Sequence, residues 1–209
     1  SGSDVSFSAP ADYNGSEDFI VSISDGQETD SQGITVTVNA VNDAPVLSSI
    51  GSKSVDEDNV LNLLLQGSDV EGDQLSYSIE GGNQITANIS GSDLTLTPAD
   101  NFSGSESFSV TVSDGSLSDF ETFTLIVNAV NDAPVLASVS DVSFDEDGSG
   151  STSLSGSDVD GDNLTYDVTG GSDIVATLSG SDVSFSAPAD YNGSEDFTVS
   201  VSDGQETDS

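Results

Sequence analysis

The sequence predicts an all-β protein built from tandem seven-stranded Greek-key β-sandwich domains arranged end to end as a rod. Three observations lead to this prediction. The segment Val41–Leu47 recurs letter for letter at Val130–Leu136, 89 residues later, and a fixed period is typical of a domain array. Apolar and polar residues alternate with a period of two, as at Phe108, Val110 and Val112, which indicates half-buried strands. Clusters of Gly, Asn, Asp and Ser separate these runs.

The strands of one complete repeat begin after a proline. Pro45 cannot donate to a strand ladder and forces the preceding residue to be extended, which suits a strand entering a new domain. Leu61, Leu63 and Leu65 alternate with polar residues and predict the second strand. Seven short strands in about 90 residues are typical of a β-sandwich. The expected strands are about 46–56 (broken), 59–66, 74–80, 84–89, 92–97, 107–113 and 120–128.

Turn sequences separate the later strands. Leu75–Ile79 is strand-like and precedes the turn Glu80–Asn83. Ser90–Asp93 divides the fourth strand from the fifth, and Ser113–Gly115 divides the sixth from the seventh. No segment has a convincing helical period, so all the regular elements are expected to be strands.

Domain boundaries are expected at the Asn-Asp-Ala-Pro segments. Residues 1–31 and 179–209 differ at only two positions, so the duplicated unit looks like a pair of domains. Nothing in the third copy corresponds to Gln32–Ala40, which is expected to be a final strand. The expected domains are the C-terminal part of one domain (1–40), a complete domain (41–129) and a domain lacking its last strand (130–209).

The composition excludes several classes of function. There are 38 Asp and Glu residues, one cationic residue (Lys53) and no His, giving a formal charge of −37. Such a charge repels nucleic acid and anionic membranes, and no stretch is long and apolar enough for direct membrane insertion. The absence of Cys and His excludes thiolate and imidazole metal sites and Ser-His-Asp catalysis. Bound cations would offset the self-repulsion, although a solvated, halophile-like surface remains an alternative.

Short acidic motifs recur in loop-like positions, at Asp69–Asp73 and Asp158–Asp162. Calcium takes six to eight oxygens from carboxylates, Asn side chains and backbone carbonyls. Two carboxylates in a tight loop with a nearby Gly meet part of that need. An EF-hand is rejected, because its twelfth position is Glu80 in one copy but Thr169 in the other, and strand-like sequence follows.

Four segments resemble cadherin repeats, in the same order along the chain. Val55–Asp58 resembles their early Glu motif, and Asp69–Ile79 resembles their Asp-x-Asp-x-Gly-x-Asn…Tyr-Ser-Ile segment. Asp12–Gly26 resembles their Leu-Asp-Arg-Glu to Ala-x-Asp-x-Gly stretch, without the Arg-Glu, and Val36–Pro45 resembles their linker. More narrowly, the Val-Asn-Asp-Ala-Pro-Val junction resembles the cadherin-like tandem repeats of giant bacterial surface adhesins, which are commonly exported by type I secretion.

This resemblance implies a cadherin/Ig-like fold and one or two calcium ions (Ca2+) at each joint between domains. Asn39 stands where cadherins have Asp, and Val41 stands where they have Asn, so only the carbonyl of Val41 could ligate. The implied ligands of the first joint, with those of its acidic loop, are Asp12 with Asn14, Asn39, Asn42, Asp43, Asp69, Glu71, Asp73 and Asp114. Those of the second joint and its loop are Glu57, Asp100, Asn128, Asn131, Asp132, Asp158, Asp160, Asp162 and Asp203.

Each acidic motif also has a metal-free interpretation. Asn42-Asp43 and its copy could form an Asx-turn before proline, and Asp25-Gly26 and its copies could be ordinary hairpin turns. Asp145–Asp147 could be a solvated acidic loop.

The resemblance implies calcium-stiffened extender or stalk repeats of a long extracellular or cell-surface bacterial adhesin. They would mediate adhesion or biofilm formation by projecting a distal binding region. The expected partners are neighbouring repeats, with self-association or a surface ligand engaged through other domains. We expect no enzyme, because catalytic residues duplicated in every copy would be unusual. Two alternatives remain open: a calcium-dependent carbohydrate- or protein-binding module, and a self-assembling fibre whose incomplete domain accepts a strand from a neighbour.

Overall fold

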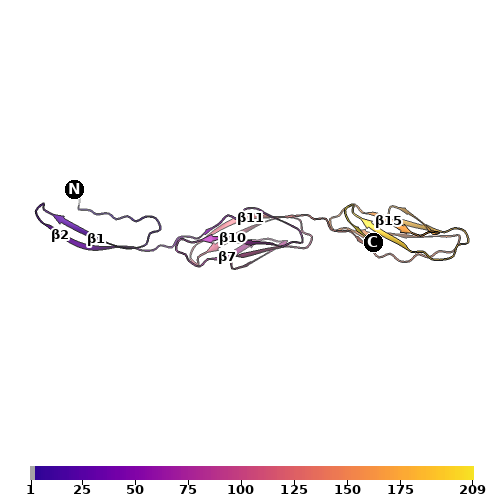
Figure 1. Cartoon of the computed structure of the whole chain (residues 1–209), viewed down its shortest axis with the longest axis horizontal. Helices are drawn as coiled ribbons and strands as arrows, with labels where there is room; N and C mark the ends of the chain where they lie inside the picture. The colour runs from indigo at the N-terminus through magenta and orange to yellow at the C-terminus, as the bar shows by residue number, and fades with distance from the viewer. Residues whose placement is uncertain (1–2) are drawn as a thin grey trace. The chain divides into compact units, whose positions relative to one another are not determined.

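The computed structural model describes residues 3–209. The chain divides into two compact units, Ser1–Asn128 and Ala129–Ser209. Every regular element in residues 3–209 is a β-strand, and the strands form small, mostly antiparallel sheets (Figure 1). The prediction of an all-β chain of tandem β-sandwich domains is confirmed. Within the same residues, no helix has the length and apolar character needed to span a membrane.

The first unit contains a complete sandwich. Its strands are β3 (Val46–Leu47), β4 (Lys53–Asp56), β5 (Leu61–Leu64), β6 (Gly67–Ser68), β7 (Ser76–Gly81), β8 (Ile85–Ser90), β9 (Asp93–Pro98), β10 (Gly104–Ser113) and β11 (Ser118–Asn128). One sheet has the order β4-β11-β10-β7, and the other has the order β5-β9-β8. Figure 1 shows β7, β10 and β11 side by side. β3 pairs with β6, and β4 pairs in parallel with the end of β11.

The observed strands follow the expected ones, with two informative differences. The broken first strand is observed as β3 and β4, which take different partners. The second expected strand divides into β5, which pairs with β9, and β6, which pairs with β3. Partner choice, which is a tertiary property, therefore decides where these strands are interrupted.

The alternation along the strands places one face of each sheet in a common core. Leu94 and Leu96 on β9 and Val110 on β10 are fully buried. Phe108 and Phe123 stack in the same core with ring centroids 5.5 Å apart and an interplanar angle of 25°. Each such aliphatic or aromatic side chain contributes about 1.5–3 kcal/mol when fully buried. The core therefore accounts for the period of two seen in the sequence.

The second unit repeats this plan. Its strands are β12 (Val135–Leu136), β13 (Ser149–Ser153), β14 (Gly156–Ser157), β15 (Thr165–Gly170), β16 (Val175–Ser179), β17 (Asp182–Ser186), β18 (Phe197–Ser202) and β19 (Thr207–Asp208). The sheets have the orders β13-β17-β16 and β15-β18-β19, and β12 pairs with β14. Leu154, Val183 and Phe185 form the buried centre, and Phe185 meets Phe197 edge to face with centroids 5.1 Å apart.

The start of the chain forms a hairpin of β1 (Gly15–Ser24) and β2 (Thr29–Val38). It corresponds to the β10–β11 hairpin of the complete sandwich. Ile23 is 76% exposed, whereas its counterpart Val112 is 0% exposed. The apolar face of this hairpin type is therefore buried only where the other strands of a sandwich cover it.

Candidate functional site

Acidic and amide side chains gather at both ends of the complete sandwich. The β10–β11 ladder runs from the Gly104–Val127 pair at one end to the Ser113–Ser118 pair at the other. At the Ser113 end lies the group that we name the first linker cluster: Asn42, Asp43, Asp69, Glu71, Asp73 and Asp114. At the Gly104 end lies the group that we name the distal cluster: Asp56, Glu57, Asp58, Asp100, Asn101 and Asn128.

In the first linker cluster, the segment before Pro45 is hydrogen-bonded to two loops of the sandwich. The side-chain amide of Asn42 donates to Asp114 Oδ2 at 2.8 Å and to the carbonyl of Asp43 at 3.1 Å. The backbone amide of Asp43 donates to Glu71 Oε2 at 3.2 Å. Residues far apart in the sequence thus meet where the linker enters the domain.

The Asp69 loop is closed by one oxygen of its first carboxylate. Asp69 Oδ1 accepts hydrogen bonds from the backbone amides of Glu71 and Asp73, both at 3.0 Å. Gly72 has a φ of 79°, a left-handed conformation that favours glycine and lets the chain turn back on the carboxylate. The loop therefore holds Asp69 in a fixed orientation with its second oxygen still available.

The second unit contains an equivalent group, the second linker cluster: Asn131, Asp132, Asp158, Asp160, Asp162 and Asp203. The side-chain amide of Asn131 donates to Asp203 Oδ2 at 2.8 Å. The backbone amide of Asp132 donates to Asp160 Oδ2 at 2.8 Å. Asp160 thus takes the place that Glu71 has in the first linker cluster, and the two clusters have the same hydrogen-bonding pattern.

A buried carboxylate oxygen lacks a partner at the same position in both units. Within the part of the chain that the structure describes, Asp69 Oδ2 and Asp158 Oδ2 are buried and accept no hydrogen bond. Their Oδ1 atoms bind backbone amides, as in the 3.0 Å bond from the amide of Asp162 to Asp158. An unsatisfied buried acceptor costs about 1–3 kcal/mol, and more when it is charged. A cation or a hydrogen-bond donor bound at this oxygen would therefore stabilise each linker cluster.

The residues present fit calcium. Their donors are all oxygens, which suits a hard cation, and the partnerless oxygens of Asp69 and Asp158 offer ready ligands. Within residues 3–209, no three Asp or Glu side chains lie close enough together to hold a metal on carboxylates alone. Like charges repel, and Asp69, Glu71 and Asp114 instead accept hydrogen bonds from amides. A calcium ion would complete its six to eight oxygens from Asn side chains, carbonyls and water.

Two carboxylates of these clusters are held in the anionic form. The side-chain amide of Asn42, followed by the backbone amides of Leu117 and Ser116, lowers the pKa of Asp114. In the second unit, the backbone amide of Glu206 and then the side chain of Asn131 lower the pKa of Asp203. Both side chains are therefore charged at neutral pH, which is the form that binds cations.

The Asp-Gly turns also close their hairpins as ordinary turns do. In the first hairpin, Asp25 Oδ1 accepts from the amides of Gln27 and Glu28 at 2.9 and 2.8 Å. These bonds lower the pKa of Asp25. Asp114 and Asp203 make the same turn with Oδ1 and use Oδ2 for the linker asparagine. One aspartate therefore serves both the turn and the linker cluster.

The distal cluster joins three segments of the first sandwich. The side-chain amide of Asn128 donates to Asp56 Oδ1 at 2.9 Å, and the backbone amide of Glu57 donates to the carbonyl of Asn128 at 2.9 Å. Asp58 Oδ1 accepts from the amide of Asn101 at 3.0 Å. Glu57 is 3% exposed. The loops of Glu57 and Asp100 therefore meet at this end of the sandwich.

The predicted ligand sets are thus brought together in part. Asp12 lies in the turn before β1, and Asn39 follows β2. Within residues 3–209, neither side chain is hydrogen-bonded to the first linker cluster. Of the set predicted for the second joint, Glu57, Asp100 and Asn128 lie in the distal cluster of the first unit, and the other six residues form the second linker cluster.

Sequence reasoning missed a carboxylate that holds a turn. Glu106 accepts from the consecutive backbone amides of Asn83, Gln84 and Ile85, at 2.8, 2.8 and 3.2 Å. Gly81 precedes this turn, and a Cβ there would lie 2.5 Å from the carbonyl oxygen of Ser107. The turn therefore depends on a glycine and on a carboxylate that is distant in sequence.

The second unit repeats this arrangement with Glu195. The backbone amides of Asp173 and Ser172 lower its pKa to about 2. Asp119 was missed in the same way: its Oδ2 accepts from the amide of Leu47 at 2.9 Å. Asp208 does the same for Leu136 at 2.8 Å. The recurrence of these acids at the 89-residue offset is the signal that could have found them.

A family model described as "Bacterial Ig domain" matches residues 42–127 and 131–209, which together make up most of the chain. The chain belongs to the bacterial Ig domain family. The predicted Ig-like fold is thereby confirmed, whereas the adhesin-type junction stays a prediction. The two matches lie in different compact units, so each unit contains a bacterial Ig domain.

This bacterial Ig protein is 34% identical over 129 residues to "Chitinase A" of Pseudoalteromonas piscicida. The aligned part covers 60% of this chain and 16% of that protein. Solved structures of similar fold include two domains (EC1-2) of human protocadherin-24, with 20% identity, a TM-score of 0.49 and coverage of 77% of this chain and 86% of that one. The endo-fucoidan hydrolase MfFcnA4 has 20% identity and a TM-score of 0.36, with coverage of 95% and 33%.

Proposed function

We propose that these repeats are calcium-binding extenders of a secreted or cell-surface bacterial adhesin. They space a distal binding region from its anchor and so serve adhesion or biofilm formation. The bacterial Ig domains occur in tandem, and residues 1–31 and 179–209 are nearly identical. Both observations support a role in which the repeats serve to lengthen the protein. The calcium assignment depends on one observation: Asp69 and Asp158 each have a buried carboxylate oxygen, Oδ2, without a hydrogen-bond partner.

Calcium, when bound, supplies positive charge to oxygens that repel one another without it. In the second linker cluster the ligands are Asp158, Asp160 and Asp203, with Asn131 and Asp132 of the linker segment. Without the ion, the bonds that hold this segment include those from Asn131 to Asp203 and from Asp132 to Asp160. Ion binding therefore fixes the linker segment on the sandwich that follows it, and ion removal frees the segment to act as a hinge.

The acidic clusters serve structure and not catalysis in this proposal. Their carboxylates recur in each copy and bind backbone amides, as Asp69 and Asp114 do. The chain spans 16% of the length of the chitinase relative, so that protein's activity is not assigned to these repeats. In this proposal the repeats lie outside the cell, as parts of an exported protein.

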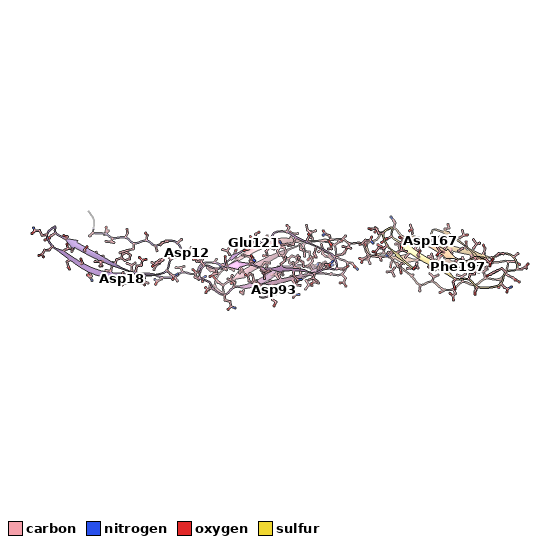
Figure 2. The ribbon with its side chains drawn as sticks, in the orientation of Figure 1. Asp12, Asp18, Asp93, Glu121, Asp167 and Phe197 are labelled. Atoms are coloured by element: carbon pink, nitrogen blue, oxygen red, sulfur yellow. The ribbon has the colours of Figure 1, made fainter. Side chains whose placement is uncertain are left out.

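A calcium titration of the full chain tests the proposal, with melting temperature and hydrodynamic radius as readouts. We expect both to rise with calcium at fixed ionic strength. The double variant Asp69→Asn/Asp158→Asn should lose both responses. Asp93→Asn/Asp182→Asn is the matched control, because it removes the same charge from equivalent strand positions of the two units (Figure 2 labels Asp93). If calcium changed neither property of the parent chain, the acids would be ordinary surface charge.

A further inference from the structure

The outer sheet face of the complete repeat differs in charge from the same face of the other copies: two positions have Ser in place of Asp, and Glu80 stands where the third copy has Thr169. This face comprises the outward positions of β7, β10 and β11, which alternate with core positions. Ser78 stands where the third copy has Asp167 on β15, which Figure 2 labels. Ser107 stands where the other copies have Asp18 and Asp196. The sandwich fold therefore tolerates acids here, and the complete repeat carries hydroxyl groups instead.

An exposed aromatic ring lies on the same face. Phe120 is 65% exposed, and the corresponding residue is Ser31 in the first copy and Ser209 in the third. Strand register places Phe120 beside Thr111, and Thr111 beside Ser78. Neighbouring strands are about 4.8 Å apart, so the ring and two hydroxyl groups form a row across the sheet. The core does not explain Phe120, because its side chain lies outside it.

Two nearby acids bind backbone amides away from this face, and a third lies on it beside the row of Phe120. Asp119 occupies an alternate position of β11 and binds the amide of Leu47. Glu106 binds the turn before β8. Glu80, which pairs with Ser109, is an outward residue of the edge strand β7 and lies on the face, in the row next to Thr111 and Ser78. The row of Phe120, Thr111 and Ser78 therefore carries no charge, in a chain whose formal charge is −37.

We infer that this face, centred on Phe120, binds a neutral, extended polysaccharide. The net charge of the chain repels anionic glycans and nucleic acid, and Lys53 is its single cationic residue. Phe120 and the partly exposed Ile126, six positions apart on β11, fall short of the several hundred Å² of contiguous apolar surface that marks a protein interface. A neutral sugar matches both parts of the face: its C–H groups contact an aromatic ring, and its hydroxyls exchange hydrogen bonds with Ser and Thr.

Affinity electrophoresis of the full chain tests this inference, with hydroxyethyl cellulose and galactomannan as neutral probes and carboxymethyl cellulose as the anionic counterpart. We expect retardation by at least one neutral probe, with a dissociation constant on the order of 1 mM, and none by the anionic one. Phe120→Ser, which installs the residue of the other copies, should weaken binding about tenfold. Leu64→Ser is the matched control: this side chain is 63% exposed on β5, the third copy has Ser153 there, and retardation should persist.

Several outcomes would overturn the inference. One is no retardation of the parent chain by either neutral probe, and another is equal retardation of Phe120→Ser and the parent. Concentration-dependent self-association that Phe120→Ser abolishes, without retardation, would show a contact between copies instead. Ser107→Asp should reduce retardation by restoring a charge to the face. Retardation should persist in chelator, so the result is distinguishable from that of the calcium proposal.

Discussion

Replacement of Asp69 by asparagine should change stability in opposite directions with and without calcium. Asp69 Oδ1 accepts two backbone amides at 3.0 Å, and the asparagine Oδ1 can keep both. The substitution removes a buried carboxylate oxygen that has no partner within residues 3–209 and places an amide donor in a carboxylate-rich cluster. In calcium-free buffer the variant should therefore be more stable than the parent, by about 1 kcal/mol.

Calcium should reverse this order. Extracellular modules bind calcium with dissociation constants of about 10⁻⁴–10⁻³ M. At about tenfold over the dissociation constant, one site adds about 1.4 kcal/mol to the free energy of unfolding of the parent. A domain of this size shifts its melting temperature by about 4–8 °C per kcal/mol, so the parent should gain about 6–11 °C. Asp69→Asn should gain little in the first unit, because it lacks the charged oxygen.

Differential scanning calorimetry of the full chain would measure the effect, in about 10 mM calcium chloride and in chelator with sodium chloride at equal ionic strength. Asp93→Asn serves as the charge-matched control and should respond to calcium as the parent does. This prediction would be refuted if Asp69→Asn gained as much thermal stability from calcium as the parent. It would also be refuted if the variant were less stable than the parent by the same amount in both buffers.

Three further predictions concern the fold and the pKa values. The pKa of Glu195 is held at about 2, below its ordinary value of 4.5, so its stabilising effect is present above pH 4.5 and is lost as the pH falls toward 2. Glu195→Gln should flatten the loss of stability across that window, as followed by circular dichroism. Asn131→Ala removes a bond to Asp203 and should raise the pKa of that residue, measurable by NMR titration. Leu96→Ala, at a fully buried position, should lower the free energy of unfolding by about 2–5 kcal/mol in urea, whereas Ile126→Ala, 45% exposed, should change it far less.

Much of the fold could be predicted because the strands carry local patterns. Leu94 and Leu96 are buried on the side of β9 that alternation predicts. The division between β5 and β6 could not be predicted, since it depends on which strand each segment pairs with. Local sequence therefore determines which residues face the core, and tertiary pairing determines where a strand is interrupted.

In the candidate site, too, the local features could be predicted from the sequence, and most contacts between distant residues could not. The Asp69 loop could be found from the sequence because its hydrogen bonds join residues two and four positions apart. The meeting of Asn42 with Asp114 joins residues 72 positions apart, and only the resemblance to cadherin repeats suggested it. Glu106 was missed because a carboxylate that binds backbone amides requires no particular sequence in its partners.

A crystal structure of the full chain grown in about 10 mM calcium, with anomalous differences measured, would test whether the linker clusters bind calcium. We expect an anomalous peak at each linker cluster, about 2.3–2.6 Å from Asp69 Oδ2 and from Asp158 Oδ2. An anomalous map without peaks there, with these two oxygens bound to water or to protein donors, would contradict this expectation.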